Sequence, residues 1–270
     1  MLKYEVIMQS LTGYKISGDG QPILLLHSSM SSKAQWKMLT SQLQDNYRTL
    51  AVDLWGYGEA PYPTHLAEHF SLQDEVERVV AVLAQTVGNS APVHVVGHSY
   101  GAATALRFAT QHSERVLSLT IYEPVAFHLL SREEPAFLEI AEVVKKLEET
   151  IAQNDEMGAT QQFIDYWSGP GAFKRYPADI RNALSGQIRK VALDFKALIE
   201  EPTRLEDYAD FTFSTYLMAG EQSPLSSRRI SERLRESLPN LEFKQTPWGH
   251  MAPITHVADI NELILARFMD

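Results

Sequence analysis

The sequence predicts an α/β protein in which helices cover a mostly parallel sheet. Short apolar runs alternate with amphipathic stretches along much of the 270 residues, and this rhythm is typical of parallel sheets flanked by helices. Residues 127–204 interrupt it, because they are polar, helical in pattern and lack a convincing strand. An insertion of that length needs structure of its own. We therefore predict an α/β core formed by residues 1–126 and 205–270, with residues 127–204 forming a helical cap over the sheet edge where ligands bind.

Each element of the first half follows from a local pattern. The first twenty residues alternate weakly around glycines, which predicts an antiparallel hairpin at a sheet edge. Continuous apolar runs too short for helices predict buried parallel strands, at residues 22–27, 48–53, 93–97 and 116–122. Apolar residues spaced on one face predict helices, at residues 32–43, 72–87 and 100–112.

The second half begins with the cap and then returns to alternation. Helices are expected in the cap at residues 137–153, 159–166 and 177–200. The core is expected to resume with two strands, at residues 213–219 and 241–246, and two helices, at residues 225–238 and 257–269. The chain therefore returns to the same sheet after the cap.

Composition narrows the classes of function. Hydrophobic residues make up 44% and charged residues 21%, which is ordinary for a globular protein. A net charge of −10 without a basic block disfavours a nucleic-acid partner. The absence of cysteine excludes disulfides, thiolate metal sites and a cysteine nucleophile. Without a signal-like N-terminus or an 18-residue apolar stretch, we expect a cytoplasmic protein with no membrane span. We expect no cofactor or metal, and the sequence leaves homo-oligomer formation open.

The candidate nucleophile lies between a predicted strand and a predicted helix. An apolar strand leads into Gly97-His98-Ser99-Tyr100-Gly101, and an alanine-rich helix follows. This Gly-x-Ser-x-Gly pattern in this context is a nucleophile elbow, in which the backbone turns sharply and passes close to its neighbours. Ser99 is therefore expected to expose its hydroxyl above the sheet, while His98 is expected to pack beneath the turn.

A serine nucleophile needs a general base, and imidazole suits that task near neutral pH. The order serine, acid, histidine leaves four histidines after the elbow: His112, His128, His250 and His256. His250 follows the last predicted strand on a loop loosened by Gly249. Because ligands collect at the carboxyl ends of parallel strands, His250 is the candidate base.

Four motifs together resemble the α/β-hydrolase superfamily over nearly the whole chain: Leu24-Leu25-Leu26-His27, Asp53-Leu54-Trp55-Gly56-Tyr57-Gly58, Gly97-His98-Ser99-Tyr100-Gly101 and Gly249-His250-Met251. The resemblance implies an eight-stranded, mostly parallel sheet with a helical cap after strand six. It also implies an oxyanion hole made by the main-chain N–H groups of Ser29 and Tyr100. Most relatives carry His-Gly after strand three, where this chain has His27-Ser28-Ser29. Main-chain donors survive that change of side chain.

The triad acid departs further from the usual pattern. Relatives usually carry Gly-x-x-Asp after strand seven, whereas this chain reads Gly220-Glu221-Gln222-Ser223. Some members, including certain haloalkane dehalogenases, place the acid after strand six, where Glu123 stands here. A carboxylate at the end of a buried strand needs a partner, and His250 is the expected one. Glu221 and Asp210 remain alternatives.

The resemblance favours a serine hydrolase that cleaves a small-molecule ester, thioester or lactone through an acyl-enzyme. Trp167, Phe173 and Tyr176 are candidates for lining its substrate pocket, although aromatic residues of a cap also form its own core. Two alternatives stay open. One is carbon–carbon bond hydrolysis of a diketone by the same triad, and the other is a ligand-binding relative without catalysis.

Overall fold

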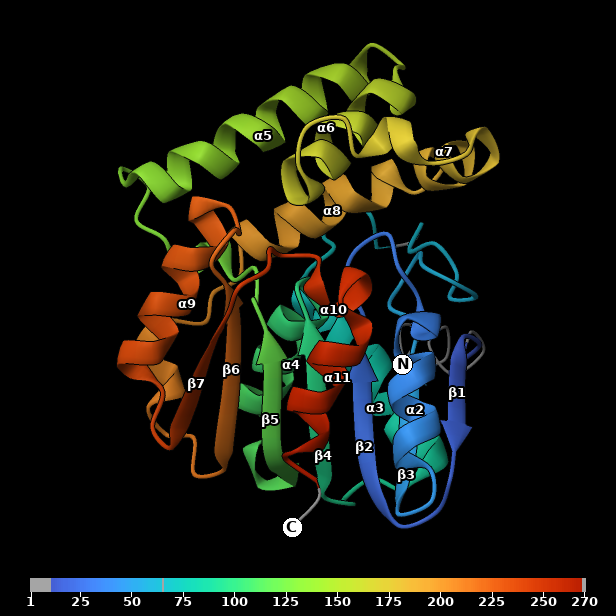
Figure 1. The fold of residues 1–270 in the computed structure, drawn as a ribbon, viewed down its shortest axis with the longest axis vertical. Coiled ribbons are helices and arrows are strands. Elements are labelled where there is room, and N and C mark those ends of the chain that lie inside the picture. Colours follow the sequence, from blue (N-terminus) through green and yellow to red (C-terminus); the bar gives the residue numbers. More distant parts are fainter. Residues whose placement is uncertain (1–10, 65, 269–270) are drawn as a thin grey trace.

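A sheet of seven strands lies at the centre of the part of the chain that the computed structural model describes, residues 11–64 and 66–268 (Figure 1). Its strands are β1 (Tyr14–Ser17), β2 (Gln21–Leu26), β3 (Tyr47–Val52), β4 (Val93–His98), β5 (Val116–Tyr122), β6 (Ser214–Gly220) and β7 (Leu241–Thr246). Their order is β1-β3-β2-β4-β5-β6-β7, and every neighbouring pair is parallel except β1 and β3. The predicted mostly parallel α/β fold is confirmed. The expected additional strand around Tyr4 lies outside the described residues, and the described strand of the predicted hairpin, β1, pairs with β3.

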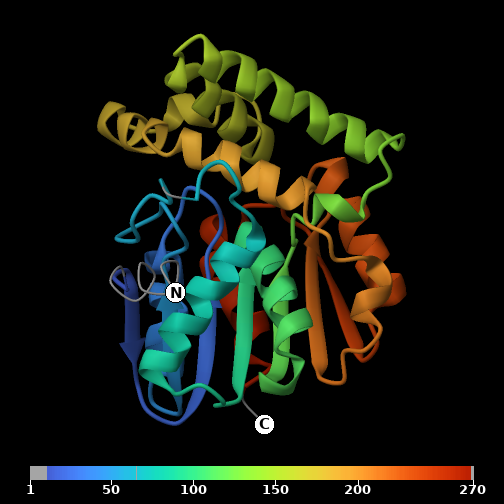
Figure 2. The ribbon, with the colours of Figure 1, turned by 180° about the vertical axis from the view of Figure 1, so that it is seen from behind.

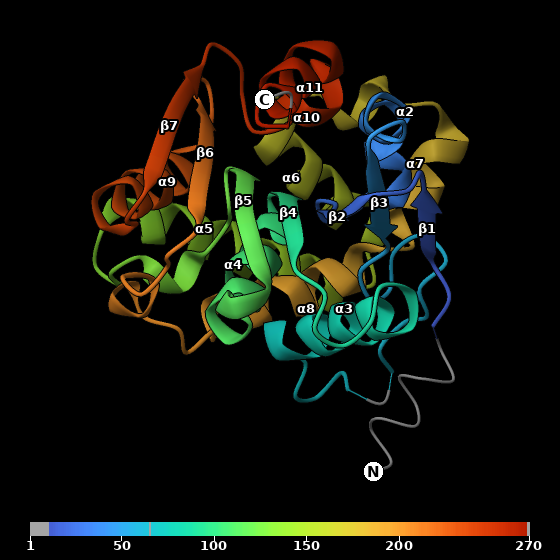
Figure 3. The ribbon, with the colours of Figure 1, turned by 90° about the horizontal axis from the view of Figure 1, so that it is seen from below.

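Helices cover both faces of this sheet, which explains why its central strands are continuous apolar runs. One face packs under α2 (Lys37–Leu43) and α11 (Val257–Leu265). The other packs under α3 (Leu72–Thr86) and α4 (Tyr100–Gln111), with α9 (Leu225–Ser237) beside β6 (Figures 2 and 3). The two buried clusters that result hold the sheet between two helical layers.

The helical insertion between β5 and β6 forms a further layer above the carboxyl ends of the strands (Figure 1). Its helices are α5 (Pro135–Ala152), α6 (Glu156–Ser168), α7 (Ala178–Ser185) and α8 (Ile188–Ile199). We refer to these helices and their connections as the cap; its boundaries at residues 127 and 204 stay a prediction. Among the described residues, we find no helix with the length and apolar character needed to cross a bilayer.

Two predicted helices differ from the structure. The single helix expected at residues 177–200 is divided into α7 and α8, with Gly186 at the end of α7. Glycine costs about 1 kcal/mol relative to alanine inside a helix, so the break falls where the helix is weakest. The helix expected at residues 32–43 starts as a 3₁₀ turn, Lys33–Trp36, in which the Ser32 hydroxyl accepts a hydrogen bond from the Ala34 N–H.

His128 makes the stability of the fold depend on pH. Its ring contacts the Leu198 carbonyl at the end of α8 and the Tyr208 hydroxyl. Burial lowers its pKa from 6.5 to about 4. The unfolded chain therefore binds a proton that the folded chain rejects, and the stability contributed above pH 6.5 is lost as the pH falls toward 4.

We expect His128→Gln to remove this dependence. The difference in unfolding free energy between wild type and His128→Gln should shrink by up to about 1.4 kcal/mol for each pH unit below 6.5. Urea unfolding of both proteins at pH 7, 6 and 5 measures it. A difference that stays constant over these three values would show that His128 keeps its ordinary pKa in the folded chain.

Candidate active site

Ser99 lies in a strained turn between β4 and α4, as the elbow pattern predicts. Its φ of +55° is uncommon for a residue other than glycine. A Cβ on Gly97 would come within 2.7 Å of the Ala102 Cα, and one on Gly101 within 2.4 Å of the Leu26 carbonyl oxygen. Both glycines are therefore needed for the close approach of β4, α4 and β2, which holds Ser99 at the carboxyl edge of the sheet.

Three buried side chains lie in series at this edge. The Ser99 hydroxyl is 2.9 Å from His250 Nε2, and His250 Nδ1 is 2.7 Å from Glu123 Oε2. Because a carboxylate only accepts hydrogen bonds, Nδ1 carries the proton and Nε2 of the neutral ring is free to accept from Ser99. This arrangement can remove a proton from the hydroxyl and stabilise the imidazolium that results.

Glu123 is held at the end of β5 by several contacts. The Gly220 N–H donates to Oε1 at 2.6 Å, and the Ser227 hydroxyl on α9 donates to Oε2 at 3.1 Å. The backbone of Glu123 has a φ of +43°, so it leaves the strand in a left-handed turn. The alternative acids lie elsewhere: Glu221 is exposed, and Asp210 is exposed and precedes β6 at the opposite end of the sheet.

The two proposed oxyanion donors also lie beside Ser99. Among the hydrogen bonds of the described residues, none occupies the N–H of Ser29 or Tyr100. Tyr100 is the first residue of α4, whose opening N–H groups have no intrahelical acceptor and carry the positive end of the helix dipole. Ser29 follows the buried Ser28 on the loop after β2, and it lines a cavity together with Ser99. Both donors are therefore available to a developing negative charge.

His98 supports the base from beneath, a contact that the sequence did not reveal. Burial and the neighbouring His250 ring lower the pKa of His98 well below its ordinary value, so the ring is neutral. Its Nε2–H donates to the His250 carbonyl oxygen at 2.9 Å, and its Nδ1 accepts from Gln35 at 3.2 Å. The Gln35 side-chain oxygen in turn accepts from the Ser28 N–H and hydroxyl, each at 3.1 Å. One chain of hydrogen bonds thus joins the loop of the base to the loop of the oxyanion hole.

A cavity of about 230 Å³ opens above Ser99 and His250. Its lining is mainly apolar and comes from the cap and from the loops after β2 and β7: Ser28, Ser29, Met30, Ser31, Phe163, Ile164, Trp167, Ser168, Tyr176, Ile180, Leu184, Met251 and Ile254. Two of the three aromatic residues expected there, Trp167 and Tyr176, are present. The third, Phe173, is buried in the hydrophobic core of the cap and does not line this cavity.

Residues 21–257 match the family model described as alpha/beta hydrolase fold. The chain belongs to this family. The match spans both the elbow and His250, so the serine and the histidine of this α/β hydrolase lie inside the region that defines the family.

Relatives of this α/β hydrolase differ in the reactions that their names describe. Probable lysophospholipase BODYGUARD 4 from Arabidopsis thaliana is 32% identical over 116 residues, 42% of this chain and 27% of that protein. A 2-hydroxy-6-oxo-6-(2'-aminophenyl)hexa-2,4-dienoic acid hydrolase from Metapseudomonas resinovorans is 31% identical over 113 residues, 41% of this chain and 38% of that protein. The chain therefore spans well under half the length of these relatives. An esterase structure from Exiguobacterium antarcticum superposes with a TM-score of 0.76 at 17% identity, over 95% of both chains, which shows the shared fold.

Trp167 is one of four residues that this cavity shares with a larger groove of the α/β hydrolase. Its ring lies over His250, with 4.0 Å between ring centroids, and it lines both the cavity and a neighbouring groove of about 760 Å³. We expect Trp167→Ala to join the two spaces and to admit longer acyl chains. For each additional methylene that the variant buries, kcat/KM of the longer ester relative to that of the shorter ester should rise about fourfold, because burial of a methylene contributes about 0.8 kcal/mol.

Turnover of p-nitrophenyl butyrate, hexanoate and octanoate by wild type and Trp167→Ala measures this preference. Tyr176→Ala is the comparison, since Tyr176 lines both spaces but is 42% exposed. We expect a smaller change in chain-length preference for it. Equal preferences in wild type and Trp167→Ala would contradict the expectation that this substitution joins the two spaces.

Proposed function

We propose that the chain is a serine hydrolase that cleaves a small-molecule ester, thioester or lactone. Ser99 attacks the carbonyl carbon while His250 takes its proton, and the N–H groups of Ser29 and Tyr100 stabilise the oxyanion. His250 then gives the proton to the leaving group, and water hydrolyses the acyl-enzyme by the same route. Glu123 holds the imidazole in the correct tautomer throughout.

The observation that carries this proposal is the continuous series from Ser99 to Glu123. Its two hydrogen bonds, of 2.9 and 2.7 Å, join buried groups, where electrostatic interactions are stronger than in water. A serine in a strained turn, aligned with a base and an acid, favours catalysis over ligand binding alone.

The character of the cavity favours a neutral ester over an anionic diketone. None of the described residues lining the 230 Å³ cavity is lysine or arginine. The related hydrolase from Metapseudomonas resinovorans acts, by its name, on a dienoic acid, and a carboxylate in a mainly apolar cavity needs a cationic partner. Apolar side chains such as Phe163, Ile180 and Ile254 instead suit a hydrocarbon acyl or alcohol group.

Active-site labelling tests the proposal. A fluorophosphonate should label wild type at one site that peptide mapping places at Ser99, and it should not label Ser99→Ala. Ser223→Ala is the control, because Ser223 is also buried but is not a neighbour of His250 in the described hydrogen bonds. Equal labelling of wild type and Ser99→Ala would refute the assignment of the nucleophile. Rapid turnover of a ring-cleavage diketone, with poor turnover of p-nitrophenyl esters, would favour the carbon–carbon reaction.

A further inference from the structure

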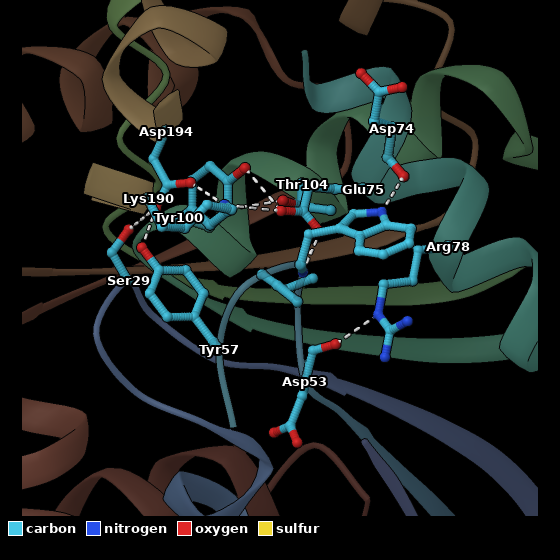
Figure 4. Close-up of polar contacts among 12 residues, drawn as sticks. Ser29, Asp53, Tyr57, Asp74, Glu75, Arg78, Tyr100, Thr104, Lys190 and Asp194 are labelled. Carbon is cyan, nitrogen blue, oxygen red and sulfur yellow. Dashed lines mark hydrogen bonds and ion pairs between the residues drawn. The ribbon is translucent and has the colours of Figure 1, made fainter. Parts of the chain in front are cut away.

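A cluster of buried charges connects cap helix α8 to the two segments that carry the proposed oxyanion donors, namely the loop after β2 and the start of α4. Lys190 and Asp194, one turn apart on α8, face Glu75 on α3 across the boundary between cap and core (Figure 4). Tyr57, from the loop after β3, completes the cluster, and all four side chains are buried. The triad described above uses none of them.

Both oxyanion residues are tied to this cluster by their side chains. The Ser29 hydroxyl donates to Asp194 Oδ2 at 2.7 Å, and the Tyr57 hydroxyl donates to the same oxygen. The Tyr100 hydroxyl donates to Glu75 Oε1 at 3.0 Å. Lys190 Nζ joins the two carboxylates, because it donates to Asp194 Oδ1 and, at 3.2 Å, to Glu75 Oε1.

The surroundings enclose the ammonium group of Lys190 and keep the tyrosine donors protonated. Lys190 Nζ lies 4.5 Å from the centre of the Phe70 ring and 4.8 Å from the centres of the Tyr57 and Tyr100 rings, an aromatic cage for the ammonium group. Burial holds the pKa of both tyrosines well above the ordinary value, so their hydroxyls remain donors. Groups buried in this way cost free energy unless they have partners, and each of these groups has a hydrogen-bond partner inside the cluster.

We propose that Asp194 is a positioning residue of the oxyanion hole, and the proposal rests on the function proposed above. Its carboxylate fixes the Ser29 side chain and thereby the direction of the Ser29 main-chain N–H. Through Lys190 and Glu75 the same cluster fixes Tyr100, the second donor. Cap helix α8 then contributes to the active site through Asp194.

The geometry of catalysis explains why such a tether matters. A donor misplaced by about 0.5 Å no longer matches the oxyanion, and the loss of one donor costs about 10² to 10³ in rate. In this chain the side chain of Ser29 provides an anchor for the loop after β2. The tether acts on the transition state, so it should affect kcat more than KM.

Ser29→Ala tests the proposal most cleanly, because it removes the tether and keeps the main-chain N–H. We expect kcat for p-nitrophenyl butyrate to fall about tenfold, less than for loss of a donor, with KM within about twofold. The Ki of an alkyl trifluoromethyl ketone, whose adduct places an oxyanion in the hole, should rise by the same factor. Hydrogen exchange of the segment containing residues 28–31 should become faster.

Asp194→Asn should lower kcat more than Ser29→Ala does. Adding Ser29→Ala to Asp194→Asn should change kcat little further, because both substitutions act on the contact between Ser29 and Asp194. The control is Arg189→Gln. Arg189 is also on α8, and its replacement removes an exposed ion pair with Glu156 on α6. This variant should leave kcat, Ki and hydrogen exchange unchanged. If Asp194→Asn does not fold, the Ser29→Ala variant alone still tests the positioning role.

Unchanged kcat, Ki and exchange in Ser29→Ala, with an active wild type, would overturn the positioning role and leave the proposed function intact. A wild type that neither hydrolyses esters nor reacts with fluorophosphonate would overturn both. A lower melting temperature for Ser29→Ala with an unchanged Ki would show that the cluster only holds cap and core together.

Discussion

Replacing Ser99 by alanine should lower kcat for activated esters by at least about 10⁴-fold, with the fold intact. The hydroxyl oxygen is the atom that forms the acyl bond, and among the described side chains it is the hydroxyl aligned with His250 Nε2. Alanine in the elbow keeps the backbone geometry and removes only the nucleophile. Steady-state hydrolysis of p-nitrophenyl butyrate, with melting temperature as the measure of folding, gives the result.

The residual rate of Ser99→Ala distinguishes two accounts. Without the nucleophile, the oxyanion hole and substrate binding still give a residual rate of hydrolysis above the rate in water. This residual rate should be insensitive to fluorophosphonate. If Ser99→Ala retained more than about a tenth of wild-type kcat, another group would be the nucleophile and the elbow would be structural.

Glu123→Gln should lower kcat by several hundred-fold to about 10⁴-fold with little change in fold. The glutamine amide can donate to His250 Nδ1, which would place the imidazole proton on Nε2, where it can no longer accept from Ser99. The amide also lacks the charge that stabilises the imidazolium. Rates for wild type and Glu123→Gln at saturating substrate, compared across pH, measure the effect.

Two controls separate this acid from its alternatives. Glu221→Gln should be nearly silent, because Glu221 is exposed. Ser223→Ala should also be nearly silent, although Ser223 occupies the position where relatives usually carry the acid. A larger loss for Glu221→Gln than for Glu123→Gln would overturn the assignment of the acid.

The parts of the fold that depend on local patterns were predictable from the sequence. The strand from Val93, the glycines of the elbow and the position of His250 after β7 each follow from a short run of residues. The parallel order of the strands follows from their alternation with helices. The break between α7 and α8 does not follow from the sequence, because one glycine in a helical pattern does not say whether the helix bends, continues or stops.

Contacts between distant segments were beyond the sequence alone. His98 reads as a residue that packs beneath the elbow, and only the structure shows it bonded to the His250 carbonyl. Asp194 lies 165 positions from Ser29, in a helix whose pattern is amphipathic like many others. The orientation of Phe173 was equally unpredictable. The sequence places Phe173 in the cap but does not say that its side chain faces the core of the cap.

The prediction of the acid combined a resemblance with chemistry. The resemblance to members with the acid after strand six pointed to Glu123, and a charge at the end of a buried strand requires a partner, which made His250 its expected neighbour. Glu221 and Asp210 remained alternatives. The structure adds the details that spacing could not supply, namely the left-handed turn at Glu123 and the contacts from Gly220 and Ser227. The catalytic roles of these residues stay predictions until activity is measured.

Trapping the acyl-enzyme tests the central claim most directly. Rapid mixing with excess p-nitrophenyl butyrate, an acid quench and mass spectrometry of the peptides would detect the covalent intermediate. We predict a burst of about one p-nitrophenol per chain and a butyryl group on the peptide containing Ser99, with neither in Ser99→Ala. Steady hydrolysis by the wild type with a butyryl group on another residue, or a burst that persists in Ser99→Ala, would contradict the account.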